Sequence, residues 1–222
     1  MQAVRYHDHG GRDVLRVEEA DRPSPDEDEV LIDVDAAAVN PVDTYFREGS
    51  YDLPALPWIP GSDVAGTVAE VGEDVSRFAV GDRVFGTGLG KTTPGTCAEF
   101  VAAPTDLLAP LPDGVDPEVG AAVGLVGVTA WGTLVDACGL EPAERCLVHG
   151  GSGGVGHVAV QLADSVGAQV TTTASTGYHD RLEALGADDV FDYRRDDLEA
   201  AVKDAGQPDV ILDHMLDAYL GF

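Results

Sequence analysis

The sequence is short of basic residues. It holds 13 Lys and Arg against 40 Asp and Glu, a formal net charge of −27, and its only lysines are Lys91 and Lys203. Such a charge keeps a chain soluble and repels nucleic-acid phosphates and anionic membranes, so we expect no nucleic-acid or membrane partner. Because the acidic residues are spread along the chain, we favour a halophilic source over an ordinary acidic cytosolic protein.

Cysteine and long apolar runs are also scarce. Cys97, Cys138 and Cys146 are odd in number and form no C-x-x-C pair, which indicates neither a disulfide framework nor a cysteine zinc lobe. The first residues have no apolar signal core, so we expect a cytoplasmic protein. The longest uncharged run, 119–135, is short and glycine-rich for a membrane span of about 20 residues. We expect this run to be a buried helix.

The first half of the chain predicts a β-rich, barrel-like domain over residues 1–115. Short runs of apolar residues are separated there by glycine and proline. Asn40 and Pro41 have the residue types of a helix cap and a first helical residue. The expected strands cover 2–6, 14–18, 30–39, 64–71, 83–85 and 99–102, and the expected helix covers 41–47.

The second half, residues 116–222, predicts alternating strands and helices around a parallel sheet. A helix is expected from Asp116 to Cys138, with interruptions at Gly124 and Gly127. Four strands follow, whereas a doubly wound nucleotide domain has six. The last residues, 217–222, are typical of a helix cut off after one turn, so we expect an incomplete Rossmann domain. The expected strands cover 146–148, 170–173, 190–191 and 210–212, and the expected helices between them cover 155–166, 179–185 and 196–205.

The glycines of 150–156 form the spacing Gly151-x-Gly153-x-x-Gly156 between an expected strand and an expected helix. In a dinucleotide-binding turn these glycines allow a tight turn, close approach of a pyrophosphate, and packing of helix on strand. The helix N-terminus offers unpaired N–H groups to the phosphates. The cofactor-binding residues predicted here are Gly151, Ser152, Gly153, Val155 and Gly156, and a glycine-rich surface loop is the alternative.

Four motifs then carry a family resemblance: residues 39–45 (VNPVDTY), 61–72 (GSDVAGTVAEVG), 80–84 (VGDRV) and 147–156. Together they resemble the zinc-free, zeta-crystallin-like quinone oxidoreductase branch of the medium-chain dehydrogenase/reductase superfamily. The resemblance covers the whole chain. It implies an α/β protein, with a GroES-like catalytic domain followed by a Rossmann domain and an active site in the cleft between them. It also implies a C-terminal return segment and a final sheet strand that this sequence lacks, so the family's homodimer is doubtful for this chain.

The resemblance is closest to the relatives that lack zinc. Zinc alcohol dehydrogenases of the superfamily carry Gly-His-Glu where this chain has Gly61-Ser62-Asp63, and a ligand cysteine where it has Asn40-Pro-Val-Asp43. Catalytic zinc needs three protein ligands, typically Cys, His or Glu. The six histidines are scattered along the sequence. We therefore expect no metal.

Without zinc, a substrate carbonyl must be polarised by hydrogen-bond donors. The resemblance implies that Asn40, Tyr45 and Tyr51 line the nicotinamide and substrate pocket and that Thr129 lies near the nicotinamide. Asn40 can equally cap a helix, and Tyr51 can equally pack against Trp58. A hydroxyl bonded back into its own helix is the alternative for Thr129.

The cofactor is predicted at the end of the second Rossmann strand. An acid there would bind the ribose 2′-OH and indicate NAD, whereas Thr173–Gly177 contains none. The small hydroxyl residues Ser175 and Thr176, with Arg181 nearby, suit a 2′-phosphate, so we expect NADPH. Arg181 can alternatively pair with Asp180 or Glu183.

The resemblance bears on this cofactor assignment in two ways. Tyr193 resembles a family tyrosine beside the same phosphate and the adenine, which favours NADPH. Tyr178 stands where the branch often has a basic residue, which weakens the assignment.

Together these features predict a zinc-independent, NADPH-dependent oxidoreductase that transfers hydride to a quinone or another α,β-unsaturated carbonyl. An enoyl-thioester reductase of the same fold is the first alternative. A nucleotide-binding fragment with impaired catalysis is the second.

Overall fold

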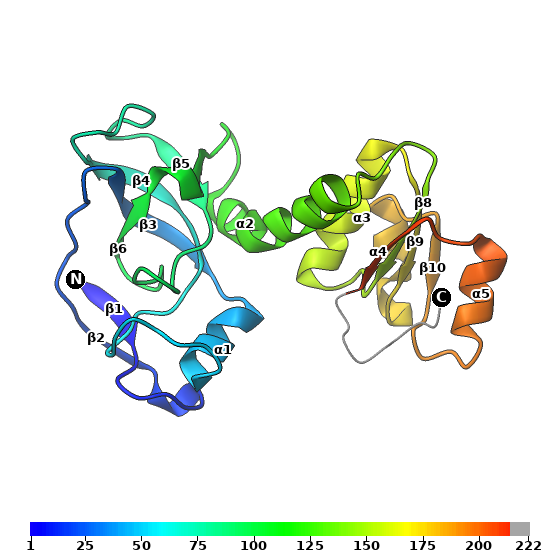
Figure 1. Cartoon of the computed structure of the whole chain (residues 1–222), viewed down its shortest axis with the longest axis horizontal. Coiled ribbons are helices and arrows are strands. Elements are labelled where there is room, and N and C mark those ends of the chain that lie inside the picture. Colours follow the sequence, from blue (N-terminus) through cyan, green and yellow to red (C-terminus); the bar gives the residue numbers. More distant parts are fainter. Residues whose placement is uncertain (214–222) are drawn as a thin grey trace. The chain divides into compact units, whose positions relative to one another are not determined.

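The computed structural model describes residues 1–213, so the expected helical turn at 217–222 lies outside the described residues. Two compact units make up the chain, Met1–Leu125 and Val126–Phe222, and Figure 1 labels helices and strands of both. The division falls inside helix α2 (Pro117–Trp131). The limits expected for the domains, 1–115 and 116–222, stay a prediction.

The first unit is built on a five-stranded antiparallel sheet in the order β6-β3-β4-β5-β7. Alternate residues of its long strands, such as Val30, Ile32, Val64 and Val68, are fully or almost fully buried in one apolar core. The expected β-rich domain is therefore confirmed. The strands are β3 (Glu29–Ala38), β4 (Asp63–Val71), β5 (Arg83–Gly86), β6 (Phe100–Pro104) and β7 (Leu108–Pro110), with a separate hairpin of β1 (Gln2–Arg5) and β2 (Arg16–Glu19).

A single helix interrupts these strands, α1 (Pro41–Glu48), with Asn40 at its N-cap. Gly49 ends the helix in the left-handed conformation (φ 82°), which glycine adopts without steric cost. The helix buries Asp43 and Phe46 and leaves Tyr45 on its exposed side. It thus presents one polar and one apolar side chain to the interior of the unit.

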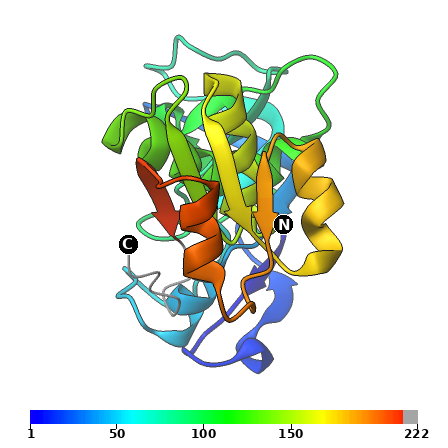
Figure 2. The same ribbon diagram turned by 90° about the vertical axis from the view of Figure 1, so that its right-hand side faces the viewer.

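The second unit is a four-stranded parallel sheet in the order β10-β9-β8-β11. This is the first-four-strand order 3-2-1-4 of a Rossmann sheet, which confirms the predicted fold class. Figure 2 shows the strands with helices packed against them. The strands are β8 (Arg145–His149), β9 (Gln169–Thr173), β10 (Asp189–Phe191) and β11 (Val210–Asp213), and the helices are α3 (Gly154–Val166), α4 (His179–Ala184) and α5 (Leu198–Ala205).

Strand β8 shows how both faces of this sheet are covered. Its residues Cys146 and Val148 belong to the apolar cluster that includes α3, whereas Leu147 packs with Leu198 and Val202 of α5. Successive side chains of a strand point to opposite faces. A continuous apolar run is therefore what a strand buried on both sides requires.

Helix α2 differs from the expectation in its continuity. The predicted interruptions at Gly124 and Gly127 are wrong, because the helix runs unbroken through both. A Cβ at position 124 would lie 2.6 Å from the Asp63 carboxylate, and one at position 120 would lie 2.7 Å from Leu111. Gly120 and Gly124 thus let the helix approach the sheet closely, and tertiary contact outweighs their low helix propensity.

The same segment is long and apolar enough to cross a membrane when only length and composition are considered. Pro117–Ala137, which is α2 followed by a π-helical turn, has 21 residues and a mean hydropathy of 1.5, a test that core helices of soluble proteins also pass. The expected burial of this helix is wrong for most of its length, because only 28% of its most apolar 18 residues are buried. Ala121, Ala130 and Leu134 are buried, whereas Val128 and Trp131 are 62% and 53% exposed.

Candidate functional site

The glycine loop between β8 and α3 is shaped by contacts that exclude side chains. A Cβ on Gly151 would overlap the Thr172 hydroxyl, and one on Gly156 would overlap the Gly150 carbonyl oxygen. A Cβ on Gly153 would meet only the Gly150 carbonyl oxygen, at 3.3 Å. The first and third glycines therefore serve the turn and the packing of helix on strand, and the middle one leaves its exposed side open, as the sequence predicted for a phosphate-binding turn.

The N-terminus of α3 fits an anion. Gly153 is the N-cap residue and provides no side-chain cap, so the first-turn N–H groups of this 13-residue helix have no side-chain acceptor. Those N–H groups and the positive end of the helix dipole favour a negative group such as a phosphate. Ser152 and Gly153 also line two pockets, which adds space for a ligand on the loop.

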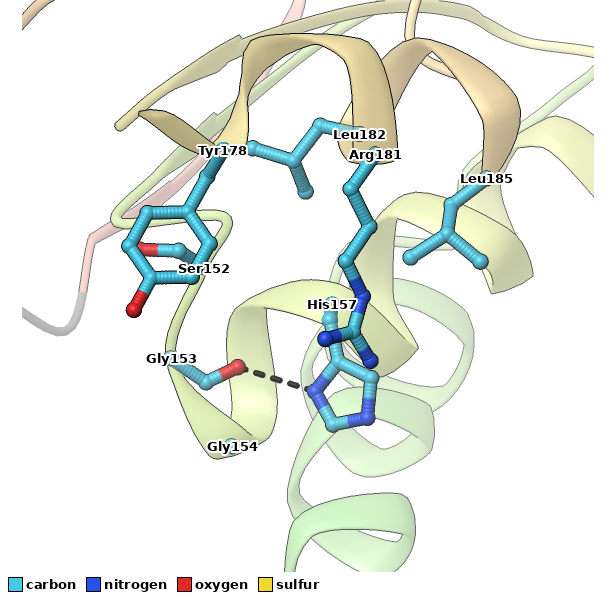
Figure 3. Close-up of a pocket in the computed structure, with 8 residues that line it drawn as sticks. All are labelled: Ser152, Gly153, Gly154, His157, Tyr178, Arg181, Leu182 and Leu185. Atoms are coloured by element: carbon cyan, nitrogen blue, oxygen red, sulfur yellow. Dashed lines mark hydrogen bonds between the residues drawn. The ribbon is translucent and has the colours of Figure 1, made fainter. Parts of the chain in front are cut away.

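The first pocket has a volume of about 210 Å³ and lies between the start of α3 and helix α4. Figure 3 shows Arg181 reaching from α4 toward the first turn of α3, where His157 Nδ1 donates to the Gly153 carbonyl oxygen at 2.9 Å. The lining residues are Ser152, Gly153, Gly154, His157, Tyr178, Arg181, Leu182 and Leu185.

Arg181 is set apart from the other basic side chains of residues 126–213. Arg145 donates to a backbone carbonyl, and Arg194, Arg195 and Lys203 each bond to a carboxylate. No ion pair or hydrogen bond of the Arg181 side chain is found within the described part of the chain. The alternative pairing with Asp180 or Glu183 is therefore not found in residues 1–213, and the Arg181 side chain lines the pocket without a hydrogen-bond partner there.

The second pocket, of about 220 Å³, lies at the carboxyl ends of β8 and β9. Ser175 and Tyr193 both line it, and the Ser175 hydroxyl lies 3.4 Å from the Tyr193 hydroxyl. The structure thus brings these two predicted residues together, while Arg181 lines the first pocket.

Thr176 has a partner that the sequence did not suggest. Its hydroxyl donates to the Asp192 carboxylate at 2.7 Å, just beyond the end of β10. Arg194 donates to both oxygens of the same carboxylate and holds the pKa of Asp192 well below its usual range. The acid that approaches the end of β9 is therefore already paired with a cation.

In the first unit, the predicted catalytic Asn40 belongs to a buried polar network. Its side-chain amide donates to Asp63 Oδ2 at 2.7 Å, and the Leu125 N–H donates to Asp63 Oδ1 at 2.9 Å. Asp43 accepts from the Asn40 N–H at 2.7 Å and from the Ser62 hydroxyl at 2.8 Å. Burial raises the pKa of Asp63, and the nearby Asp43 adds to this, while the hydrogen bonds oppose it.

The two predicted tyrosines are solvent-accessible. Tyr45 is 47% exposed and Tyr51 is 51% exposed. The ring of Tyr51 packs edge-on against Phe46, with ring centroids 5.5 Å apart. Its expected alternative contact with Trp58 is not found in residues 1–213, where the Trp58 indole instead donates to the Gly90 carbonyl at 2.9 Å.

Thr129 lies half-buried in α2, within the second unit. Its carbonyl accepts a hydrogen bond from the Thr133 hydroxyl at 2.8 Å. The proposed role near a nicotinamide stays a prediction.

Comparison with known proteins identifies the family to which the chain belongs. Residues 26–113 match the family model described as alcohol dehydrogenase GroES-like domain, and residues 154–219 match that described as zinc-binding dehydrogenase. The quinone oxidoreductase of Lama guanicoe is 40% identical over 226 residues, which cover 99% of this chain and 68% of that protein. The chain belongs to the quinone oxidoreductase family. This family of oxidoreductase enzymes lies within the medium-chain dehydrogenase/reductase superfamily, as the sequence motifs predicted.

Two other quinone oxidoreductases are also similar to this chain. The human quinone oxidoreductase is 41% identical over 197 residues, covering 87% of this chain and 59% of that protein. The structure of Escherichia coli quinone oxidoreductase complexed with NADPH is similar over 92% of this chain and 62% of that one (TM-score 0.83, 32% identity).

Two further solved structures differ in the activity they are named for. An NAD-dependent alcohol dehydrogenase is similar with a TM-score of 0.91 and 34% identity, over 96% of this chain and 71% of that one. The CurK enoyl reductase is similar with a TM-score of 0.86 and 28% identity, over 96% of this chain and 66% of that one. The shared fold therefore does not determine the cofactor or the substrate.

Several contacts of the candidate site were not predicted from the sequence. The Asn40–Asp63 pair joins residues 23 positions apart, and the Thr173–His149 contact joins residues 24 apart. The positions of His157 and Asp192 beside the candidate site likewise became evident only from the structure. Each follows from a strand or helix that the sequence did predict, but the pairing depends on tertiary packing.

Proposed function

We propose that this quinone oxidoreductase family member is a zinc-independent, NADPH-dependent reductase of a quinone or another α,β-unsaturated carbonyl. The observation that carries the proposal is the Arg181 guanidinium, without a protein partner in residues 1–213, in a pocket that also borders the glycine loop and the start of α3. A cation kept for a ligand beside an anion-binding helix terminus suits a cofactor with an additional phosphate.

The residues of the second unit divide the binding of NADPH between them. The glycine loop and the first-turn N–H groups of α3 hold the pyrophosphate, and Arg181 with the small hydroxyl residues Ser175 and Thr176 holds the 2′-phosphate. Ser175 and Tyr193 border the ribose and adenine, and Thr129 lies toward the nicotinamide. Val155 and Gly156 give α3 its start and its close packing. When bound, the cofactor supplies the hydride.

Asn40, Tyr45 and Tyr51 are proposed to act on the substrate carbonyl. An asparagine amide has two N–H donors, and Asp63 takes one from Asn40, so the second stays available for an oxygen that gains negative charge. The exposed hydroxyls of Tyr45 and Tyr51 are further donors of this kind. Such donors stabilise developing charge without a metal.

Zinc independence is supported by the chemistry of the residues at the corresponding positions. The Asn40 amide donates to the Asp63 carboxylate, and the Ser62 hydroxyl donates to the Asp43 carboxylate. Asn40, Ser62 and Asp63 stand at the ligand positions of the zinc relatives, and here they are engaged in hydrogen bonds. Within residues 1–213 no group of three or more His, Cys, Asp or Glu side chains is arranged to hold a metal ion. These residues do not fit a catalytic zinc.

A soluble, salt-adapted, cytoplasmic enzyme is proposed, without nucleic-acid or membrane partners. The net charge of −27 supports this, and so does the close packing of Gly120 and Gly124 inside the first unit, against Leu111 and the Asp63 carboxylate. A homodimer is proposed for a full-length family member.

An enoyl-thioester reductase is the second candidate, and its support is the similarity to the CurK enoyl reductase. Binding of the nucleotide without turnover is the third. Initial rates with a quinone, a simple enone and an enoyl thioester, each with NADPH and with NADH, test all three. The proposal expects quinone or enone reduction with NADPH in preference to NADH. Preference for NADH, or turnover of the thioester alone, would contradict it, and cofactor binding without any turnover would favour the third candidate.

A further inference from the structure

Two threonines at the end of β9 are fully buried although both are polar. Thr172 and Thr173 have no exposed surface. The Thr172 hydroxyl donates to the Val148 carbonyl at 2.7 Å, across to β8. The Thr173 hydroxyl accepts from the Gly150 N–H at 3.0 Å and lies 2.7 Å from His149 Nδ1. Buried hydroxyls are costly unless they are bonded in this way, so these contacts are specific.

The Thr173 hydroxyl can satisfy both neighbours at once. It accepts from Gly150 and has one O–H left to donate, and an unprotonated His149 Nδ1 is an acceptor. Burial lowers the pKa of His149, against the opposing charge of Asp213, and so favours the neutral ring. The three groups then form one chain from the glycine loop through β9 to the last residue of β8.

Gly150 is the residue through which this chain reaches the phosphate-binding loop. It adopts a φ of 84°, in the region that favours glycine. Its carbonyl accepts from the Gly153 N–H at 3.0 Å and lies where a Cβ on Gly156 would overlap it. The hydrogen bond to its N–H therefore holds the peptide between His149 and Gly150, directly before the peptide whose carbonyl contacts Gly153 and Gly156.

We infer that Thr173 is a positioning residue for the dinucleotide loop: its buried hydroxyl, bonded to Gly150 and His149, holds the loop in the conformation that receives the cofactor phosphates. The backbone of Thr173 adds a second attachment, since its carbonyl accepts from the Gly151 N–H at 2.9 Å. Thr173 itself need not touch the cofactor. The effect on NADPH rests on the proposed function, whereas the effect on the loop does not.

The test compares Thr173→Val, which removes the hydroxyl and keeps the shape, with Thr173→Ser, which keeps the hydroxyl. Thr171→Val is the matched control, because Thr171 lies on the same strand and no side-chain hydrogen bond is found for it in residues 1–213. Two quantities are measured: the amide hydrogen-exchange rate of Gly150 without cofactor, and the Kd for NADPH. Melting temperatures of all variants report any general loss of stability.

Thr173→Val is expected to speed Gly150 exchange and to raise the Kd for NADPH by about tenfold. Thr173→Ser should restore both values and Thr171→Val should change neither. The inference is overturned by wild-type Gly150 exchanging as fast as an exposed amide, or by equal effects of the two valine variants. If the wild type binds neither NADPH nor NADH while Gly150 exchange still depends on the hydroxyl, the proposed function fails and the inference about the loop stands.

Discussion

The side-chain amide of Asn40 and the carboxylate of Asp63 are joined by a buried 2.7 Å hydrogen bond. These are two of the positions at which zinc relatives of the superfamily carry metal ligands, as the sequence motifs indicate. Here one of them is a donor and the other its acceptor. Each side chain of the pair thus already has a hydrogen-bond partner in the other, which is the arrangement from which we propose zinc independence.

The first prediction concerns metal. Protein purified without added metal is expected to contain far less than one zinc per chain, and treatment with a chelator should change neither its reductase activity nor its melting temperature. A zinc-dependent alcohol dehydrogenase treated in parallel serves as the control for effective chelation. Stoichiometric zinc, lost together with activity, would contradict zinc independence.

The second prediction concerns Arg181. Replacing Arg181 by Gln should weaken NADPH binding by roughly tenfold to a hundredfold, the usual effect of losing a hydrogen bond to a charged group, and should leave NADH binding unchanged. Titration of each cofactor measures both constants. Arg195→Gln is the matched control, since it removes an equal charge from a side chain that bonds to Asp197. Equal losses for both cofactors, or for both variants, would remove Arg181 from the 2′-phosphate site.

The third prediction concerns the packing of α3 on the loop. Gly156→Ala should destabilise the protein by about 1–3 kcal/mol, the typical effect of overpacking, because its Cβ would overlap the Gly150 carbonyl oxygen. Cofactor affinity should fall with it. Gly177→Ala is the control, because a Cβ there meets no other heavy atom within 4 Å. Denaturant unfolding of both variants checks this, and similar stabilities would show that the loop can relax.

The fourth prediction concerns pH. Because burial lowers the pKa of His149 in the folded protein, the unfolded chain binds a proton more readily below its own pKa of about 6.5. The contribution of His149 to the free energy of unfolding is then complete above about pH 6.5 and is lost as pH falls toward the lowered folded pKa, by at most about 1.4 kcal/mol per pH unit.

His149→Gln removes this titration while keeping a polar side chain. The difference in unfolding free energy between wild type and variant should therefore grow as pH rises from about 5 to about 7. Denaturant unfolding at several pH values measures it. A difference that is constant across this range would mean that the folded and unfolded pKa values are the same.

The fifth prediction concerns salt. With 40 acidic and 13 basic residues, mutual repulsion should be screened as the Debye length falls from about 10 Å at 0.1 M to about 3 Å at 1 M. The melting temperature in KCl is expected to rise steeply across this range. A flat melting temperature would contradict salt adaptation and leave the protein simply acidic.

Secondary structure was predictable wherever apolar residues repeat with a clear period. Strand β8 and helix α3 lie within a few residues of their expected limits, because a short apolar run and a helical repeat flank the glycines. Strand β7 was missed because Leu108–Pro110 has three residues and ends in proline. The continuity of α2 was missed because glycine propensity is local, while the contacts of Gly124 come from β4.

The residue types of the site were predictable, but their partners were not. Spacing alone singled out the loop glycines, and the absence of an acid after β9 singled out Arg181. Nothing in the sequence pairs Thr176 with Asp192, because the two meet only once β9 and β10 lie side by side. Hydrogen-bond partners between strands are set by register, which short apolar runs specify only approximately.

Residues 173–181 combine two separate roles, which has a practical consequence. The Thr173 hydroxyl bonds to the loop from within the sheet, whereas Ser175, Thr176 and Arg181 follow the end of the strand. The side chain that positions the loop and the side chains proposed to recognise the cofactor are therefore consecutive in sequence and have no member in common. Residues 174–181 can therefore be replaced together to change the preference between the two nicotinamide cofactors, while Thr173 and its bond to the loop are kept.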